Sequence, residues 1–117
     1  MLERFDTTKV VDIQTRSAKG TKHAIPIWIV VVGGVPYVRS VRGPRGRWYR
    51  ELLARGEGAV FAAGKSVPVR ATRDSTPEAI EAVSAALRRK YPRTGQSLES
   101  MLCAEVLDTT VRLEPEG

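Results

Sequence analysis

The sequence predicts a mainly β protein with two or three helices, an α+β fold built as one antiparallel barrel. Six stretches have the composition of strands, and most neighbouring strands are joined by short turns. The 117 residues contain no internal repeat, linker or low-complexity tract, which indicates a single domain over residues 1–117. A barrel satisfies this pattern because closing the sheet removes exposed strand edges.

The first half of the chain supplies three of the strands. Residues 8–16 mix β-branched and polar side chains and predict a strand, and a polar turn follows. Residues 24–32, AIPIWIVVV, are apolar on both faces, which is typical of a central strand covered on two sides. Gly33 and Gly34 then predict a two-residue hairpin that leads into an alternating strand over residues 35–41.

The second half alternates helices with strands. Apolar residues four apart predict a short helix over residues 46–55. Residues 75–91 predict a longer helix that opens with the capping pattern of Ser75 and Glu78, and residues 96–107 predict a third, short one. The remaining strands are expected over residues 58–64, 65–73 and 108–115.

The positive charge of the chain is concentrated in its first half. The net charge is +6, and residues 1–60 hold eleven Lys and Arg against five Asp and Glu, whereas residues 61–117 hold eight of each. A basic half favours an anionic partner such as a phosphate, a nucleotide or a nucleic acid. A solvated basic surface is the alternative.

Cysteine and histidine content excludes several kinds of site. Cys103 is the only cysteine, so an intramolecular disulfide is impossible, and with His23 as the only histidine no Cys/His metal cluster is expected. A Ser-His-Asp triad would need His23, which falls in a polar turn. The one long apolar run, residues 24–38, is interrupted and short for a membrane span, and the first twenty residues lack the apolar core of a signal peptide. We therefore expect a cytoplasmic protein.

Residues 37–53, YVRSVRGPRGRWYRELL, hold five arginines and one glutamate. Guanidinium groups bind phosphate oxygens, glycines allow close backbone approach, and the helix that follows presents free N–H groups. These features favour an anion site, with a solvated basic face and nucleic-acid binding as the other interpretations. Trp28 and Tyr37 flank the glycine hairpin and would either lie in the core or line a flat pocket, and Trp48 is expected in the core.

Residues 15–54 resemble the first half of the split β-barrel flavin-binding proteins, which include pyridoxamine-phosphate-oxidase-like and deazaflavin-dependent nitroreductase-like proteins. The likeness lies in a Thr-Arg and Gly/Lys turn, an apolar strand with P-I-W, a Y-V-R-S strand and a Gly/Arg loop before a W-Y-R-x-L helix. The KYP and TTVRLEP segments extend it over nearly the whole chain. The resemblance implies a six-stranded antiparallel split β-barrel, a homodimer, and a flavin site where the subunits meet.

The resemblance also implies cofactor-binding residues at the matching positions. They are Arg16, Lys19 and Lys22, which could reach an anionic tail; Pro26, Ile27 and Trp28, beside the ring; Arg39, Ser40 and Arg42, at the phosphate and ribityl chain; and Arg45, Arg47 and Trp48, near the phosphate. After Arg93 only Arg112 is basic, so the phosphorylated substrate of the oxidase group is not expected.

Three functions are compatible with the sequence. Few side chains suit acid–base work, so an FMN- or deazaflavin-binding reductase or oxidase of a small substrate would take its chemistry from the cofactor. The alternative is a non-catalytic binding module of the same fold, which carries or senses a flavin, haem or other anionic ligand. Nucleic-acid binding by the basic half is the third.

Overall fold

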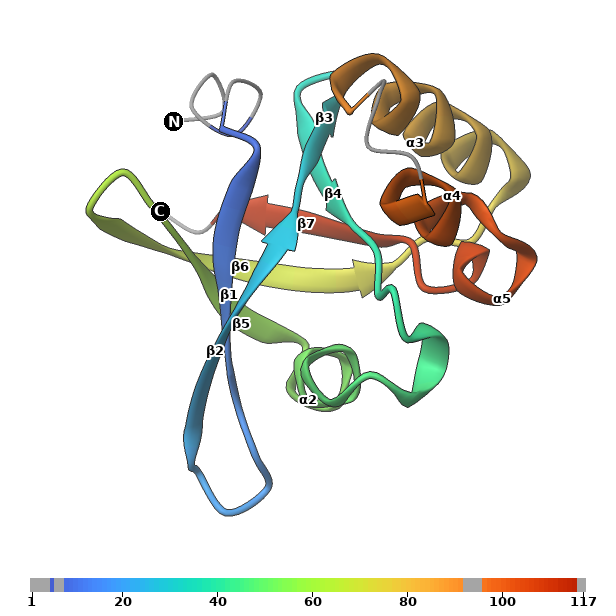
Figure 1. Ribbon diagram of the computed structural model, residues 1–117. Helices are drawn as coiled ribbons and strands as arrows, with labels where there is room; N and C mark the ends of the chain where they lie inside the picture. The colour runs from blue at the N-terminus through green and yellow to red at the C-terminus, as the bar shows by residue number, and fades with distance from the viewer. Residues whose placement is uncertain (1–4, 6–7, 92–95, 116–117) are drawn as a thin grey trace.

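The computed structural model describes residues 5, 8–91 and 96–115, and a seven-stranded antiparallel sheet forms its centre (Figure 1). The predicted mainly β, antiparallel architecture with helices is confirmed. The strands follow the order β2-β1-β5-β6-β7-β4-β3 across the sheet. They are β1 (Val10–Arg16), β2 (Lys22–Trp28), β3 (Val30–Val32), β4 (Val35–Val38), β5 (Glu57–Ala62), β6 (Lys65–Arg73) and β7 (Val111–Pro115).

The seventh strand arises because the predicted strand over residues 24–32 breaks at Ile29 into β2 and β3. The backbone groups of this buried residue bond to side chains at the end of the helix predicted over residues 75–91, instead of to a neighbouring strand. The N–H of Ile29 donates to Tyr91 Oη (3.3 Å), and its carbonyl accepts from Lys90 Nζ (2.5 Å). The prediction of one central strand is therefore wrong. β2 and β3 form the two edges of the sheet, and the chain joins them directly, so the sheet curls into a barrel that is split between its edges.

The α-helices lie where the sequence predicts them, and a short 3-10 helix, η1 (Gly43–Arg45), forms in the Gly/Arg loop where no helix is predicted. The α-helices are α2 (Arg47–Arg55), α3 (Pro77–Lys90), α4 (Gln96–Leu102) and α5 (Ala104–Leu107). The expected helix over residues 96–107 is interrupted at Cys103, which gives α4 and α5. The cap of α3 is Thr76 instead of Ser75, because the Thr76 hydroxyl accepts from the N–H of Ala79 (3.2 Å).

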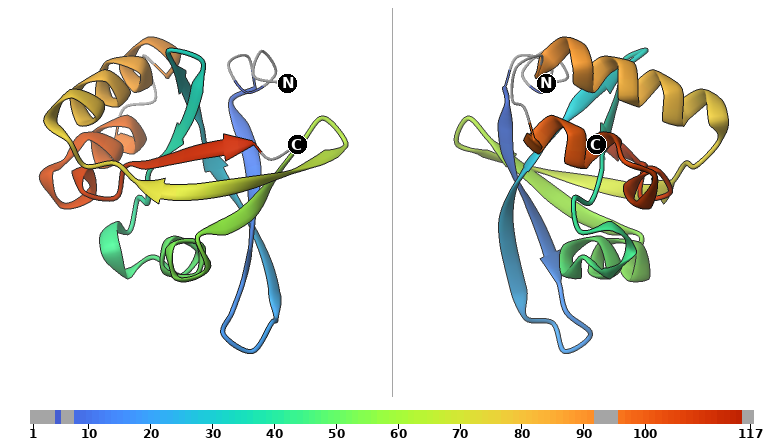
Figure 2. Two further views of the ribbon diagram at one scale, coloured as in Figure 1. Left: turned by 180° about the vertical axis from the view of Figure 1, so that it is seen from behind. Right: turned by 45° about the vertical axis from the view of Figure 1, so that its right-hand side comes forward.

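Two apolar cores hold the fold together. In the first, α2 buries Trp48, Tyr49 and Leu52 against the inner side chains of the barrel. In the second, α3 and α4 pack on the hairpin of β3 and β4, on the side of the molecule away from α2 (Figures 1 and 2). The hairpin turn is Gly33-Gly34, and both residues have positive φ (57° and 80°), as predicted for a two-residue turn.

Candidate functional site

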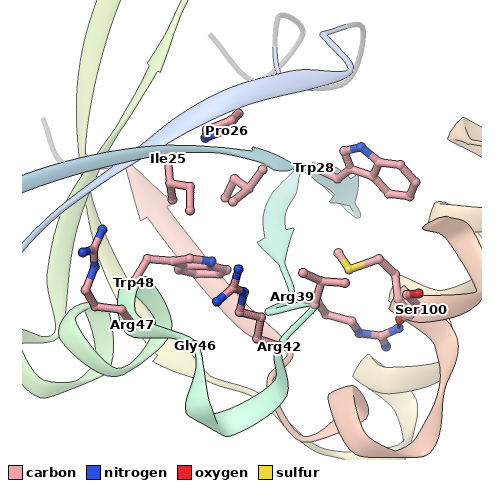
Figure 3. Close-up of a pocket in the computed structure, with 12 residues that line it drawn as sticks. Ile25, Pro26, Trp28, Arg39, Arg42, Gly46, Arg47, Trp48 and Ser100 are labelled. Atoms are coloured by element: carbon pink, nitrogen blue, oxygen red, sulfur yellow. Dashed lines mark hydrogen bonds between the residues drawn. The ribbon is translucent and has the colours of Figure 1, made fainter.

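A cleft of about 570 Å³ opens at the split of the barrel, beneath β2 (Figure 3). Its other sides are the chain that follows β4, the start of α2 and one turn of α4. The volume lies within the range of cofactor and ligand sites, about 300–1,000 Å³. The lining residues are Ile25, Pro26, Ile27, Trp28, Arg39, Val41, Arg42, Gly46, Arg47, Trp48, Ser100 and Met101.

The middle of this cleft is apolar and partly aromatic. Ile25 lies under β2, and Trp48 lies opposite it on α2 with only 7% of its surface exposed (Figure 3). At the far end Trp28 stacks on Tyr91, with ring centroids 4.1 Å apart and planes 4° from parallel. Met101 of α4 completes this end. Such walls suit a flat, apolar ring system.

The side of the cleft next to α2 is positively charged. Arg42 and Arg47 line it and are both exposed, and among the described residues no carboxylate pairs with Arg42. α2 begins at Arg47 without a side-chain cap and without an acidic residue in its first turn. A helix start carries free N–H groups and a partial positive charge, so basic residues there are unfavourable unless an anion is bound. The arrangement therefore suits a phosphate.

Ser40 lies directly behind this charged wall. The residue is fully buried, and its Oγ is the one buried side-chain polar atom without a hydrogen-bond partner among the described residues. A Cβ at Gly46 would overlap that oxygen, so only glycine lets the start of α2 pack so closely on Ser40. A buried hydroxyl without a partner is costly, and such a group beside a cleft is a candidate ligand contact.

Arg39 is bound by the protein itself. Only 1% of its surface is exposed. Its guanidinium donates to Thr110 Oγ1 (2.8 Å), Ser84 Oγ (2.9 Å) and the carbonyls of Met101 (3.0 Å) and Ile80 (2.8 Å). These bonds use four of its five N–H groups. Burial, and secondarily the charge of Arg88, lower the pKa of Arg39 to about 10, so the group stays charged at neutral pH.

Because Arg39 joins β4 to α3, α4 and the segment before β7, it fixes the α4 wall of the cleft. In Figure 3 its side chain runs toward Ser100, away from Arg42.

A second cleft, of about 510 Å³, lies at the opposite end of α2, beside the turn end of the β1–β2 hairpin. Next to it Glu51 accepts hydrogen bonds from Thr15 Oγ1 (2.7 Å) and His23 Nδ1 (3.1 Å). Burial works to raise the pKa of Glu51, but these two bonds and the charges of His23 and Arg47 outweigh it and hold that pKa below its usual value. Glu51 thus ties α2 to the hairpin.

The structure separates the predicted site residues into groups. The first cleft brings together Pro26, Ile27, Trp28, Arg39, Arg42, Arg47 and Trp48. Ser40 lies behind its wall, and Arg45 is exposed on η1 outside the lining. Arg16 and Lys22 line the second cleft, and Lys19 is exposed in the hairpin turn, outside both linings.

Sequence reasoning named Gly46 only as a glycine that allows close backbone approach to a ligand, and it missed Ile25, Val41, Ser100 and Met101 as lining residues of the first cleft. The period of two along a strand could have found Ile25 beside Ile27. It does not explain Val41, because β4 ends at Val38, three residues before the end of the strand predicted over residues 35–41. Nothing local in the sequence could have found Ser100 and Met101, because α4 reaches the cleft only through its packing on α3 and the bond between Met101 and Arg39.

No group of three or more His, Cys, Asp or Glu side chains within the described part of the chain is placed to hold a metal ion. No helix in the same part is long and apolar enough to cross a membrane.

Comparisons with solved structures show the fold. The chain aligns with a Listeria innocua protein described as a candidate pyridoxamine 5'-phosphate oxidase (TM-score 0.71, 12% identity, 99% of this chain and 90% of that one). It also aligns with HutZ, a heme storage protein of Vibrio cholerae (0.69, 14%, 98% and 87%), and with an F420 reductase (0.64, 16%, 98% and 92%). The chain therefore shares the split-barrel fold of these proteins.

The sequence comparisons add one family. The model of the family described as "Uncharacterized protein conserved in bacteria (DUF2255)" matches residues 1–113. No curated protein sequence matches the chain.

Proposed function

Because the chain belongs to DUF2255, a protein family conserved in bacteria, and has the split-barrel fold, we propose that its first cleft binds a flavin or deazaflavin and that the protein is a redox protein acting on a small substrate. One observation carries this proposal: the cleft joins an apolar, aromatic floor to the exposed Arg42 and Arg47 and to a helix start without a side-chain cap. A flavin-type cofactor has the matching two parts, a flat apolar ring system and a negatively charged phosphate on its side chain.

The residues of the cleft fit such a group. Arg42, Arg47 and the first N–H groups of α2 would hold the phosphate, and the unpartnered Oγ of Ser40 lies behind the same wall. Ile25, Ile27 and Trp48 would cover the ring and exclude water. When bound, the cofactor supplies hydride or electron transfer, while the chain supplies position and electrostatics. Among the described residues that line the cleft there is no His, Asp, Glu, Cys or Tyr to act as an acid or base.

The visible absorption spectrum of freshly purified protein tests this proposal, followed by titration with FMN and with a deazaflavin. We expect a flavin-type spectrum, or saturable uptake of one of the two. The double variant Arg42→Ala/Arg47→Ala should lose it, and Arg73→Ala/Arg89→Ala, which removes two exposed arginines outside both clefts, should keep it. A colourless protein that takes up neither compound would overturn the proposal.

A homodimer with the cleft near the subunit boundary is part of the proposal, as is a cytoplasmic location. Ile25 and Val41 line the cleft yet are 37% and 54% exposed, and Val10 and Phe61 expose further apolar surface. A second subunit would cover such surface. Light scattering after size-exclusion chromatography should give twice the 12.9 kDa of the chain, and a mass of 12.9 kDa would exclude the dimer.

The second candidate is a non-catalytic carrier or sensor of a flavin, haem or other anionic ligand. The lack of acid–base side chains in the described lining favours it, and one structural neighbour is a heme storage protein. For haem, Met101 is the one lining side chain of a type that ligates iron. Turnover of reduced nicotinamide or deazaflavin by the cofactor-loaded protein would exclude a pure carrier. Salt-sensitive binding of oligonucleotides, in place of cofactor uptake, would instead support the nucleic-acid alternative.

A further inference from the structure

The second cleft carries an excess of positive charge near the turn end of the β1–β2 hairpin, which extends beyond the rest of the barrel (Figure 1). Arg16, Lys22 and Arg55 line it, together with one carboxylate, Glu57. Neither Arg16 nor Lys22 forms an ion pair through its side chain with any described residue. The charge of this cleft is therefore left largely uncompensated by the protein.

The strand register shows that the excess of positive charge at the second cleft is a local exception to an alternation of charges across the sheet. Across the sheet, Glu114 lies opposite Arg70, and Arg70 lies opposite Glu57, so neighbouring charges alternate in sign. At the sheet edge Arg16 lies directly opposite Lys22. Like charges at opposed positions of antiparallel strands are destabilising. A bound anion between them would remove that repulsion.

The cleft already holds one of its cations in a fixed position. The Arg55 guanidinium donates through Nη2 to the carbonyl of Ser17 (2.7 Å) and through Nε to that of Arg16 (3.3 Å). These bonds leave its remaining N–H groups for a ligand. Ser66 donates to Gln14 Oε1 (2.9 Å), which leaves the amide nitrogen of Gln14 as a further donor in the same lining.

We propose that the second cleft is a binding site for a small oxyanion, a phosphate or carboxylate group, held by Arg16, Lys22 and Arg55. This site lies at the C-terminal end of α2, whereas the first cleft lies at its N-terminal end. The proposal does not rest on flavin binding. Its ligand is a compact anion instead of a polynucleotide, because the three cations gather around one cleft and Glu57 would repel an extended phosphate backbone.

The test uses the full chain free of cofactor and two probes, inorganic phosphate and succinate, at constant ionic strength. Amide chemical shifts of residues 14–24 and 55–59 should move in a saturable way with at least one probe, and which probe acts identifies the class of oxyanion. The melting temperature should rise with the same probe. Lys22→Gln should weaken binding at least tenfold, and Lys65→Gln, an exposed lysine at the β5–β6 turn, should leave it unchanged.

Charge reversal supplies a second, independent readout. Lys22→Glu places opposite charges across β1 and β2, so without anions it should melt higher than the wild type at low salt, and phosphate or succinate should no longer raise its melting temperature. The proposal would be overturned by unsaturable shifts with both probes, by shifts confined to residues 42–48, or by equal anion responses in the wild type and Lys22→Glu. Tight binding of an oligonucleotide that needs Lys22, without saturable phosphate binding, would also overturn it.

Discussion

Residues 39–47 contain two regions that use arginine in opposite ways. At the end of β4, Arg39 is buried and makes four hydrogen bonds within the protein. Only three residues later, Arg42 is exposed, lines the first cleft and pairs with no carboxylate among the described residues. The difference shows that an arginine-rich stretch is not one binding motif, because part of it stabilises the fold and part is available to a ligand.

Replacing Arg39 should have the largest effect on stability. Arg39→Leu removes a charged donor from three buried acceptors and from the half-buried carbonyl of Ile80, and we expect a loss of about 3 kcal/mol in the free energy of unfolding. Arg42→Leu at the exposed end should change it by less than about 0.5 kcal/mol. Urea denaturation of both variants measures the contrast, and equal losses would remove the distinction between the two regions.

Ligand affinity should show the opposite order. Each charged hydrogen bond to a phosphate contributes about 1.5–3 kcal/mol, so Arg42→Ala and Arg47→Ala should each weaken flavin binding by about tenfold to a hundredfold. Arg45→Ala, in the same loop but outside the cleft lining, should have a much smaller effect. Fluorescence titration of the three variants checks the order. An effect of Arg45→Ala as large as the other two would show that net charge, not position in the cleft, controls affinity.

The close contact between Gly46 and Ser40 can be tested by a double-mutant cycle. Gly46→Ala should destabilise the protein by about 1–3 kcal/mol, because the added methyl group meets Ser40 Oγ, and Ser40→Ala should restore much of that loss. Ser40→Ala alone should cost little stability, since the hydroxyl has no described partner. Additive effects of the two substitutions on urea denaturation would contradict the contact.

Local patterns predicted most of this architecture. Strand β6, the glycine turn at residues 33–34 and the apolar face of α2 all appear where the sequence predicts them. The break at Ile29 could not be predicted, because its cause is the side chains of Lys90 and Tyr91, some sixty residues away in the chain. For the same reason the sequence predicts one central strand over residues 24–32, whereas the structure has two strands, β2 and β3, at the two edges of the sheet.

The site was predicted in part. The arginines and the P-I-W strand do meet in one cleft, because β2 and the chain after β4 face each other across the split. The sequence could not show that the Arg39 guanidinium is hydrogen-bonded within the protein, because its acceptors come from α3, α4 and Thr110. It also could not separate Arg16 and Lys22 from the first cleft, because only the register of β1 and β2 places them over the second.

Glu51 offers the smallest effect and a sharper form of the same comparison, since its carboxylate interacts with the charge of Arg47 in the exposed arginine wall. Its pKa is held below its ordinary value of 4.5, so the ionised form is favoured by folding. The stabilisation is therefore fully present above that ordinary value and is lost as the pH falls through the lower folded-state pKa. Glu51→Gln should cost about 1 kcal/mol at pH 7, from weakened bonds to Thr15 and His23.

The difference in the free energy of unfolding between the wild type and Glu51→Gln should shrink toward zero at acid pH, where Glu51 is protonated in both the folded and the unfolded chain. Urea denaturation of the wild type and Glu51→Gln between pH 3 and 7 measures it, with Glu81→Gln on the exposed face of α3 as the matched control. A difference that stays constant over this range would mean that Glu51 acts through packing alone. Because Glu51 lies one turn after Arg47, its loss should also strengthen the positive field at the first cleft. Tighter anion binding by Glu51→Gln would then show that Glu51 stabilises α2 but weakens anion binding at the first cleft.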